Sequence, residues 1–221
     1  MTPCPVCGST PEAFEDAQLG CLSFHCPHCE LIFKSPACFP DEAAELKKYR
    51  EHNNSLENEG YVRMFETFID YTLSHTRTPV RRVLDFGSGP TPVLAELLRR
   101  RGFSVDIYDK YFAPDPLAEN ARYDLVTSTE VIEHIADPLG VTKMLANRLV
   151  PGGTLALMTQ FHDNDTAAYL KWWYRRDPTH LCFFTPRTFE IIAEKSGLEI
   201  VTNDRKKTIL LTTSNSPVTN P

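Results

Sequence analysis

The chain has 221 residues, of which 42% are apolar and 24% are charged, as is usual for globular proteins. This length allows one α/β domain and a small additional module. The net charge of −6 argues mildly against a nucleic-acid partner, no apolar run approaches the roughly 20 residues of a membrane span, and no signal segment opens the chain, so we expect a cytosolic protein.

Six of the seven cysteines lie in the first 38 residues. Cys4 and Cys7 form one C-x-x-C pair, and Cys26 and Cys29 form a second. Each pair turns two thiolates toward one point, and two pairs together give the tetrahedral sulfur coordination that suits zinc. Because four thiolates leave no open position, the sequence predicts a structural zinc ion bound by these four cysteines.

Residues 1–40 are therefore interpreted as a zinc-ribbon module. A segment this short buries too little apolar surface to be stable alone, so a metal would supply the missing stability. Cys21, His25, His28 and Cys38 are spare, and Cys182 stands alone. In a chain without a secretion signal, this clustering of cysteines favours metal binding over disulfides.

Residues 41–78 are expected to form a helical linker that packs on the main domain. Asp41 is a suitable N-cap for a helix over residues 41–52. A second helix is predicted over residues 57–75, because apolar residues recur there at three- and four-residue spacing. Core packing is the simpler role for this face, and contact of Tyr61 or the segment 51–54 with an active site is the alternative.

From residue 79 to residue 214, strand-like and helix-like segments alternate. Strands are predicted over residues 81–86, 103–109, 123–130, 152–160, 198–204 and 207–213, and helices over 90–101, 137–150 and 185–197. Strands separated by helices imply right-handed crossovers, and hence a doubly wound, mostly parallel sheet with helices on both faces. Residues 215–221 are expected to form a loose tail.

The first of these strands runs into "DFGSGP" and then into a helix. In a doubly wound sheet, ligands bind beyond the carboxyl ends of the strands, and Gly87 and Gly89 let the backbone approach a ligand closely. A dinucleotide site needs a third glycine where Pro92 stands, and Pro90 and Pro92 remove two N–H groups that a phosphate would use. S-adenosylmethionine (SAM) has no phosphate, so the loop favours SAM over NAD.

Two acids complete this pattern. Asp85 precedes the glycines and suits the ammonium group of SAM, usually through water, whereas it would repel a pyrophosphate. Asp109 ends the next strand and can accept hydrogen bonds from ribose hydroxyls, which would serve NAD and SAM alike. The structural alternatives are that Asp85 only caps a turn and that Asp109 is an ordinary loop acid.

Four stretches resemble, in order and spacing, the successive motifs of class I SAM-dependent methyltransferases: "VLDFGSGP", "VDIYD", "YDLVTSTEVIEHIADP" and "LVPGGTLALMT". The resemblance covers roughly residues 81–211 and is strongest to the small-molecule branch of quinone and sugar methyltransferases. It implies a Rossmann-like, seven-stranded sheet with one antiparallel strand near the edge. The cofactor-binding residues that follow are Asp85, Phe86, Gly87, Ser88, Gly89, Asp109, Lys110, Thr129 and Glu130.

The chain departs from this family between Asp109 and Tyr123. Family members fit a helix and a strand there, with an acid that reads the adenine, but residues 110–122 are too few for both. Asp115 and Glu119 are candidates to replace that acid. The aromatic side chains of Tyr108, Tyr111 and Phe112 are candidates to stack on the adenine.

The segment "EVIEHI" should lie beside the methyl donor. Methyl transfer to a hydroxyl or a carbon acid requires a positioned acceptor and removal of a proton. His134 is the best candidate for the base, because histidine titrates near neutral pH. In a helical turn Glu130 would share its face, with Glu133 rotated away. The alternative is a packing or capping histidine.

An aromatic insert, residues 161–185, should cover the acceptor. It holds Trp172, Trp173, Arg175, Arg176 and His180. An aromatic slot with a cationic rim would suit a planar or anionic acceptor, with His180 as a second base or substrate ligand. The alternative is that these rings bury the insert against the core.

The sequence therefore predicts a SAM-dependent methyltransferase that acts on a small-molecule acceptor, with O- or C-methylation preferred. One alternative is an RNA methyltransferase that docks its substrate on the ribbon. The first forty residues carry a net charge of −3, which argues against it, although arginines at 99–101 and 175–176 and the cations of 205–207 leave a basic face open. The other alternative is a non-catalytic zinc adapter that retains the cofactor fold.

Overall fold

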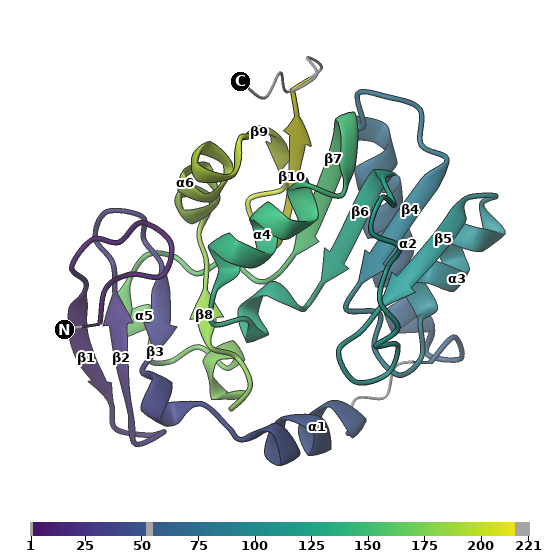
Figure 1. Ribbon diagram of the computed structural model, residues 1–221. Coiled ribbons are helices and arrows are strands. Elements are labelled where there is room, and N and C mark those ends of the chain that lie inside the picture. Colours follow the sequence, from purple (N-terminus) through teal and green to yellow (C-terminus); the bar gives the residue numbers. More distant parts are fainter. Residues whose placement is uncertain (1, 52–54, 215–221) are drawn as a thin grey trace.

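The structure is a computed structural model that describes residues 2–51 and 55–214 (Figure 1). Most of the segment 51–54 and the tail 215–221 lie outside the described residues, so their expected roles stay predictions. Among the described residues no helix is both long enough and apolar enough to cross a membrane. The cytosolic location likewise stays a prediction.

A six-stranded sheet forms the centre of the described chain, in the order β5-β4-β6-β7-β10-β9. Its strands are β4 (Arg82–Phe86), β5 (Ser104–Tyr108), β6 (Tyr123–Thr129), β7 (Leu149–Met158), β9 (Leu198–Asn203) and β10 (Thr208–Thr213). The pairs β4–β5, β4–β6 and β6–β7 are parallel, and β10 runs antiparallel to both of its neighbours. The predicted α/β class and the antiparallel strand near the edge are confirmed.

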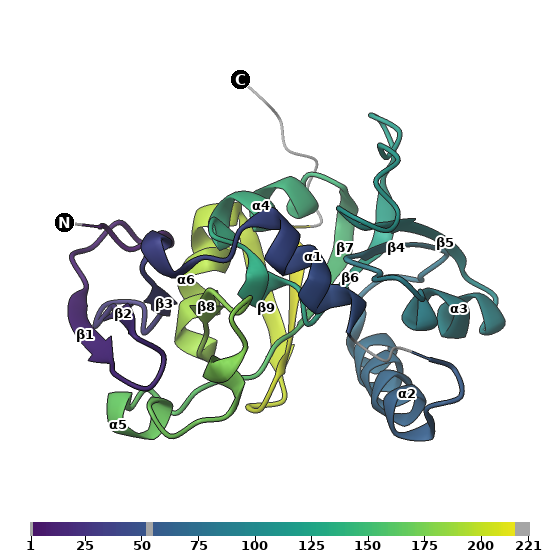
Figure 2. The same cartoon turned by 90° about the horizontal axis from the view of Figure 1, so that it is seen from below.

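Helices cover both faces of this sheet, as a doubly wound fold requires. α2 (Glu59–His75) and α3 (Val93–Arg100) pack on one face, and α4 (Pro138–Ala146) and α6 (Pro186–Ser196) on the other, and Figure 2 shows α2 and α4 on opposite sides. Successive residues of a strand point to opposite faces, so Val83 joins the core under α2 and α3 while Leu84 joins the core under α4 and α6.

The predicted number of seven strands is wrong. Residues 110–122 form no helix and no strand, and contain only an isolated bridge between Asp109 and Ala113. This segment is too short for the crossover and the strand that the family places here. β5 therefore ends the sheet at the edge where the seventh strand would lie.

Capping residues mark the helix ends, as predicted for Asp41. Asp41 begins α1 (Glu42–Arg50) by accepting a 2.8 Å hydrogen bond from the N–H of Ala44. Asp137 caps α4, and Thr185 caps α6 while Gly197 ends it with φ of 68°. α4 ends four residues earlier than predicted, because residues from Leu149 onward pair with β6 as the start of β7.

The cysteine-rich N-terminus forms a second, four-stranded antiparallel sheet in the order β1-β2-β3-β8. β1 (Glu12–Asp16), β2 (Cys21–His25) and β3 (Ile32–Lys34) come from the N-terminal module, whereas β8 (Cys182–Phe183) comes from the aromatic insert. A buried ion pair of 3.0 Å between Asp16 and Arg175 also joins the two. The module and the insert therefore fold against each other.

Candidate active site

A cavity of about 650 Å³ lies at the carboxyl ends of β4, β5 and β6. All of the predicted cofactor-binding residues line it, together with the predicted His134 and His180. Glu45 and Tyr49 of α1 and Tyr61 and Phe65 of α2 line it as well. One cavity thus gathers the ends of three strands, two N-terminal helices and the insert.

The glycine loop comes close to the segment after β6. Gly87 has φ of +82°, and a Cβ atom built on it would lie 2.2 Å from Cγ2 of Val131. Its N–H donates to the carbonyl of Tyr108 over 2.7 Å, which ties the loop to the end of β5. Only glycine allows this backbone conformation and this close approach together.

Asp109 organises the loop that follows β5. Its Oδ2 accepts from the N–H of Gly89 over 2.9 Å, and its Oδ1 accepts from the N–H groups of Tyr111 and Phe112 over 2.9 and 3.0 Å. Asp109 is therefore not an incidental loop acid, because it fixes both loops that edge the cavity. Carboxylate oxygens keep further lone pairs for ribose hydroxyls.

Asp85 lies at the bottom of the cavity and is only 2% exposed. Burial raises its pKa to about 7. Hydrogen bonds from the hydroxyl of Thr127 and the N–H of Ala95 act in the opposite direction and lower the pKa, but burial is the larger effect. Ala95 belongs to the first turn of α3, whose N-cap Pro92 offers no side-chain cap. Asp85 thus binds the backbone at the start of α3, a structural role close to the turn cap considered above, and it also lines the cavity.

The predicted helical turn over 130–135 is wrong in its first part. Glu130 has φ of +54°, and the 3₁₀ turn begins only at Ile132 (Ile132–His134). Glu130 and Glu133 therefore lie together rather than on separate faces. The hydroxyl of Tyr174 bonds Glu130 over 2.8 Å and also contacts Glu133, and burial raises the pKa of both carboxyls.

His134 and His180 lie side by side, with ring centroids 4.7 Å apart. Nδ1 of His134 donates to the carbonyl of Thr179 over 2.9 Å, and Nδ1 of His180 donates to that of Tyr174 over 2.8 Å. Each neutral ring therefore carries its lone pair on Nε2. Burial and the neighbouring His134 lower the pKa of His180 to about 3, which keeps it neutral. With Glu133, these two histidines could also hold a metal ion, since their ligand atoms lie within 4.8 Å.

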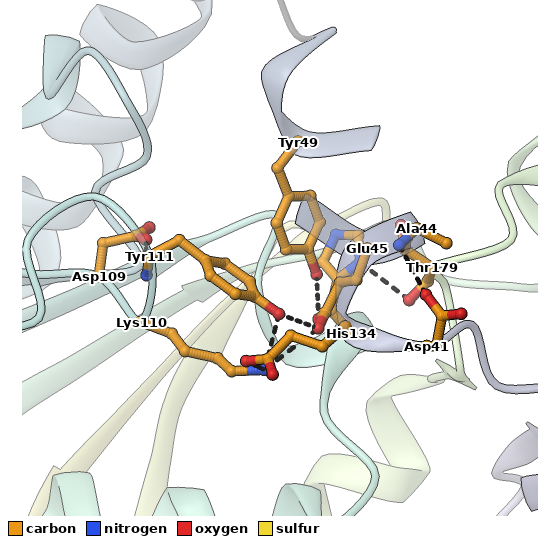
Figure 3. A network of polar contacts seen from close by, with 10 residues as sticks. Asp41, Ala44, Glu45, Tyr49, Asp109, Lys110, Tyr111, His134 and Thr179 are labelled. Atoms are coloured by element: carbon orange, nitrogen blue, oxygen red, sulfur yellow. Dashed lines mark hydrogen bonds and ion pairs between the residues drawn. The ribbon is translucent and has the colours of Figure 1, made fainter. Parts of the chain in front are cut away.

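Two residues of α1, Glu45 and Tyr49, line the cavity and take part in a network of polar contacts (Figure 3). Glu45 accepts hydrogen bonds from the hydroxyls of Tyr49 and Tyr111, and Nζ of Lys110 lies 3.2 Å from it. The ring of Tyr49 packs edge-on against His134, with centroids 5.3 Å apart. α1 therefore connects the loop fixed by Asp109 with the predicted base.

The cationic rim predicted for the insert is wrong. Arg175 is buried and faces the N-terminal module, where it pairs with Asp16, and Arg176 does not line the cavity. Among the described lining residues the only Lys or Arg is Lys110, which Glu45 holds. The aromatic part of the prediction fits better, because Trp173, 65% exposed, and Tyr174 line the cavity.

The four predicted zinc ligands converge. Sγ of Cys4 lies 3.5 Å from that of Cys29, Sγ of Cys7 lies 3.4 Å from that of Cys26, and all four atoms lie within 4.8 Å of one another. A tetrahedral zinc with bonds of about 2.3 Å would space its sulfurs about 3.8 Å apart. The donor set and its spacing therefore fit zinc.

Cys21 and Cys38 lie outside the four-cysteine cluster, as predicted, but they are bonded to each other. They form a disulfide, with Cα atoms 5.9 Å apart. Their separation of 17 residues carries no recognisable motif, unlike the two C-x-x-C pairs. The expectation of metal binding rather than disulfides thus fits only four of the six N-terminal cysteines.

Sequence reasoning missed four lining residues with titratable side chains: Glu45, Tyr49, Tyr174 and Asp177. The first two belong to α1, a helix without an apolar face, so periodicity gave no reason to place it on the cavity. Tyr174 and Asp177 lie in the predicted insert beside His180, and that position was the available signal.

A family model described as a methyltransferase domain matches residues 49–203. A ubiquinone biosynthesis O-methyltransferase from Xanthomonas campestris is 32% identical over 118 residues, covering 41% of this chain and 48% of that protein. The corresponding protein from Ruegeria pomeroyi is 28% identical over 132 residues, covering 55% and 51%. The chain thus spans about half the length of these relatives.

Among solved structures, magnesium protoporphyrin IX methyltransferase from Synechocystis PCC 6803, with bound SAH, superposes with a TM-score of 0.54 at 15% identity. The match covers 78% of this chain and 95% of that one. An O-methyltransferase family protein from Burkholderia thailandensis gives 0.50 at 14% identity over 80% and 69%. At these identities the likeness is one of fold.

Proposed function

Because this chain belongs to the methyltransferase-domain family and is by family and fold a SAM-dependent methyltransferase, we propose that it methylates a small-molecule acceptor, with transfer to oxygen or carbon preferred over nitrogen. The relatives described above, about half of whose length this chain matches, are named as O-methyltransferases. Their names support this acceptor class. The observation that carries the proposal is that the predicted cofactor residues and both predicted histidines line a single cavity.

When bound, SAM supplies a methyl group activated by a positively charged sulfur. The loop at Gly87 and Gly89 would hold its methionine part, since both glycines adopt positive φ and line the cavity. Asp85 would face the ammonium group. Asp109 would accept hydrogen bonds from the ribose hydroxyls while it keeps the glycine loop in place.

His134 would act as the base that takes the acceptor proton. Its Nδ1 is engaged by the carbonyl of Thr179, so the proton of the acceptor O–H would pass to Nε2. Glu130 would orient the acceptor, and His180, neutral at physiological pH, would accept a second hydrogen bond from it. If the two histidines served only in packing, they would not need to line the cavity.

The structural zinc at Cys4, Cys7, Cys26 and Cys29 is part of this proposal. The convergence of four sulfurs supports it, and four protein ligands leave no position for a substrate. Zinc would then brace the module rather than take part in the reaction. The boundaries at residues 40, 78 and 214 are proposed with it.

Calorimetric titration with SAM, SAH and NAD tests the cofactor assignment. We expect SAM and SAH to bind and NAD not to bind. Binding of NAD alone would overturn it, and binding of none of the three would favour the non-catalytic adapter. Elemental analysis of the purified protein should return about one zinc per chain, because the four cysteines together make one tetrahedral site.

Turnover tests the acceptor class. Incubation with labelled SAM and separate pools of small phenols, sugars and RNA should label a small molecule and leave RNA unlabelled. Labelling of RNA alone would overturn the small-molecule assignment while leaving the cofactor assignment intact.

A further inference from the structure

The N-terminal module and the acceptor side of the cavity share a line of backbone hydrogen bonds. β3 pairs with β8, with Phe33 opposite Cys182. The N–H of Lys34 donates to the carbonyl of Leu181 over 2.9 Å, and the N–H of Leu181 donates to that of Glu133 over 2.7 Å. These two hydrogen bonds therefore connect β3, through Leu181, to the turn Ile132–His134. Leu181 directly follows His180 in the chain.

The second C-x-x-C pair, Cys26 and Cys29, forms a knuckle just before β3, and this knuckle is hydrogen-bonded to the methyltransferase domain. The buried hydroxyl of Thr188 donates to the carbonyl of Cys29 over 2.8 Å. Thr185 donates to the carboxylate of Glu30 over 2.8 Å, and Nε2 of His162 donates to the carbonyl of Glu30 over 3.0 Å. The knuckle is thus held from α6 and from the chain after β7.

Packing joins the same parts. Cys26, Cys29, Leu31 and Phe33 belong to one hydrophobic cluster with the residues under α4 and α6. Lys34 is 3% exposed and its Nζ donates to the carbonyl of Asp177, a residue of the cavity wall, over 2.8 Å. Movement of β3 would therefore expose apolar surface and free the cavity wall beside His180.

The cofactor side is built differently. The described hydrogen bonds of Gly87, Ser88, Gly89 and Asp109 run among residues 87–113, at the ends of β4 and β5. β4 and β5 lie at the opposite end of the central sheet from the N-terminal module (Figure 1). These four residues can keep their hydrogen bonds when the module loosens, whereas Lys110 and Glu130 are also held by Glu45 of α1 and Tyr174 of the insert.

We propose that the metal at Cys4, Cys7, Cys26 and Cys29 is a positioning element for the acceptor half of the cavity. It fixes β3, and through β3 it fixes β8, His180 and the turn Ile132–His134. The inference rests on the zinc site and the methyl transfer proposed above. Loss of the metal then impairs use of the acceptor while binding of the cofactor persists.

The test compares the wild-type protein with Cys29→Ser, and with wild type stripped by a chelator and reloaded with zinc. Zinc content, SAH affinity and amide hydrogen exchange are measured on each. We expect metal loss to speed exchange at Lys34 and Leu181 by at least about tenfold, since their hydrogen bonds would open locally. SAH affinity and exchange at Leu84 in β4 should change by less than about threefold.

Two further variants act as controls. The double variant Cys21→Ser/Cys38→Ser removes the disulfide of the same module and none of the four clustered cysteines. It should keep zinc, and exchange at Lys34 and Leu181 should stay as slow as in wild type. Thr188→Val keeps every metal ligand but removes the hydrogen bond to Cys29, and should keep zinc while exchange at Leu181 rises by a smaller factor.

Unchanged exchange at Leu181 in zinc-free protein would overturn the inference. An equal loss of SAH affinity would also overturn it, because the metal would then support the whole domain. Wild-type protein purified without zinc would refute the zinc site, and wild type that binds no SAH would refute the methyl transfer. These last two results would remove the premises of the inference, namely the zinc site and the methyl transfer. Measurements on the wild-type protein alone reveal them, so they cannot be confused with unchanged exchange or an equal loss of SAH affinity in zinc-free protein.

Discussion

The N–H of Gly89 donates a 2.9 Å hydrogen bond to the carboxylate of Asp109, which joins the glycine loop after β4 to the end of β5. The other oxygen of the same carboxylate holds the N–H groups of Tyr111 and Phe112. One side chain therefore fixes both loops of the proposed cofactor site before any ligand arrives. Preorganisation of this kind lowers the cost of ordering the site on binding.

Replacing Asp109 by Ala should lower SAH affinity by at least about tenfold, because hydrogen bonds to a charged group contribute about 1.5–3 kcal/mol each. Calorimetry measures the affinity, and thermal unfolding verifies that the variant is folded. Asp115, a predicted candidate for the adenine contact, is exposed and does not line the cavity, so Asp115→Ala is the matched control and should bind as wild type does. Equal affinities for the two variants would contradict the role of Asp109.

Gly87→Ala should abolish cofactor binding, whereas Gly102→Ala should not. Both glycines have positive φ, so each substitution carries a similar backbone cost of about 1–2 kcal/mol. Only at Gly87 would the new Cβ lie 2.2 Å from Val131, while nothing lies within 4 Å at Gly102. Titration with SAH distinguishes the two variants.

A double variant tests whether this clash is the cause. Val131→Ala removes the two methyl groups nearest the new Cβ, so it should recover part of the SAH affinity that Gly87→Ala loses. No recovery in the double variant would place the defect in the backbone conformation of Gly87 and contradict the steric account.

The order of strands and helices was predictable because each element carries its own local pattern. The apolar runs around Val83 and Leu125 are buried on both faces of the sheet, and Asp137, Thr185 and Gly197 mark helix ends by their own chemistry. The glycine loop and its flanking acids were predictable for the same reason. Strand ends of a parallel sheet meet at one edge, so their order in sequence fixes their neighbourhood in space.

The errors lie where distant segments meet. The pairing of β3 with β8 joins residues about 150 positions apart, and the ion pair of Asp16 with Arg175 is of the same kind. Neither carries a local sequence pattern, so the insert was interpreted as a cationic rim. Glu130 shows a second limit, since its φ of +54° depends on tertiary contacts and not on its own preference.

His134→Ala should lower kcat by about a hundredfold to ten-thousandfold, the range typical of a general base. The affinity for SAH should stay within about threefold of wild type, because the hydrogen bonds of Asp109 and the glycine loop are untouched. His75→Ala on α2, outside the cavity lining, is the matched control. Unchanged turnover in His134→Ala would reject it as the base and leave packing as its role.

The raised pKa of Asp85 predicts a stability effect with a defined sign. Its carboxyl titrates near 3.8 when exposed in the unfolded chain and at about 7 in the folded protein, chiefly because burial disfavours the charge. Between these values the folded state holds a proton that the unfolded state has released. The free energy of unfolding therefore falls as pH rises, and the contribution is fully lost above the folded pKa.

Asp85→Asn should remove this penalty, because the amide does not ionise and can still accept from Thr127. The unfolding free energy of the variant relative to wild type should grow by about 1.4 kcal/mol per pH unit between pH 5 and 7 and then level off. Urea unfolding across this range measures it, with the exposed Glu119→Gln as control. Parallel pH curves for wild type and Asp85→Asn would contradict the buried, protonated carboxyl. A stabilised variant that has also lost SAH affinity would show that the ionisable carboxyl of Asp85 is retained for binding at the expense of stability.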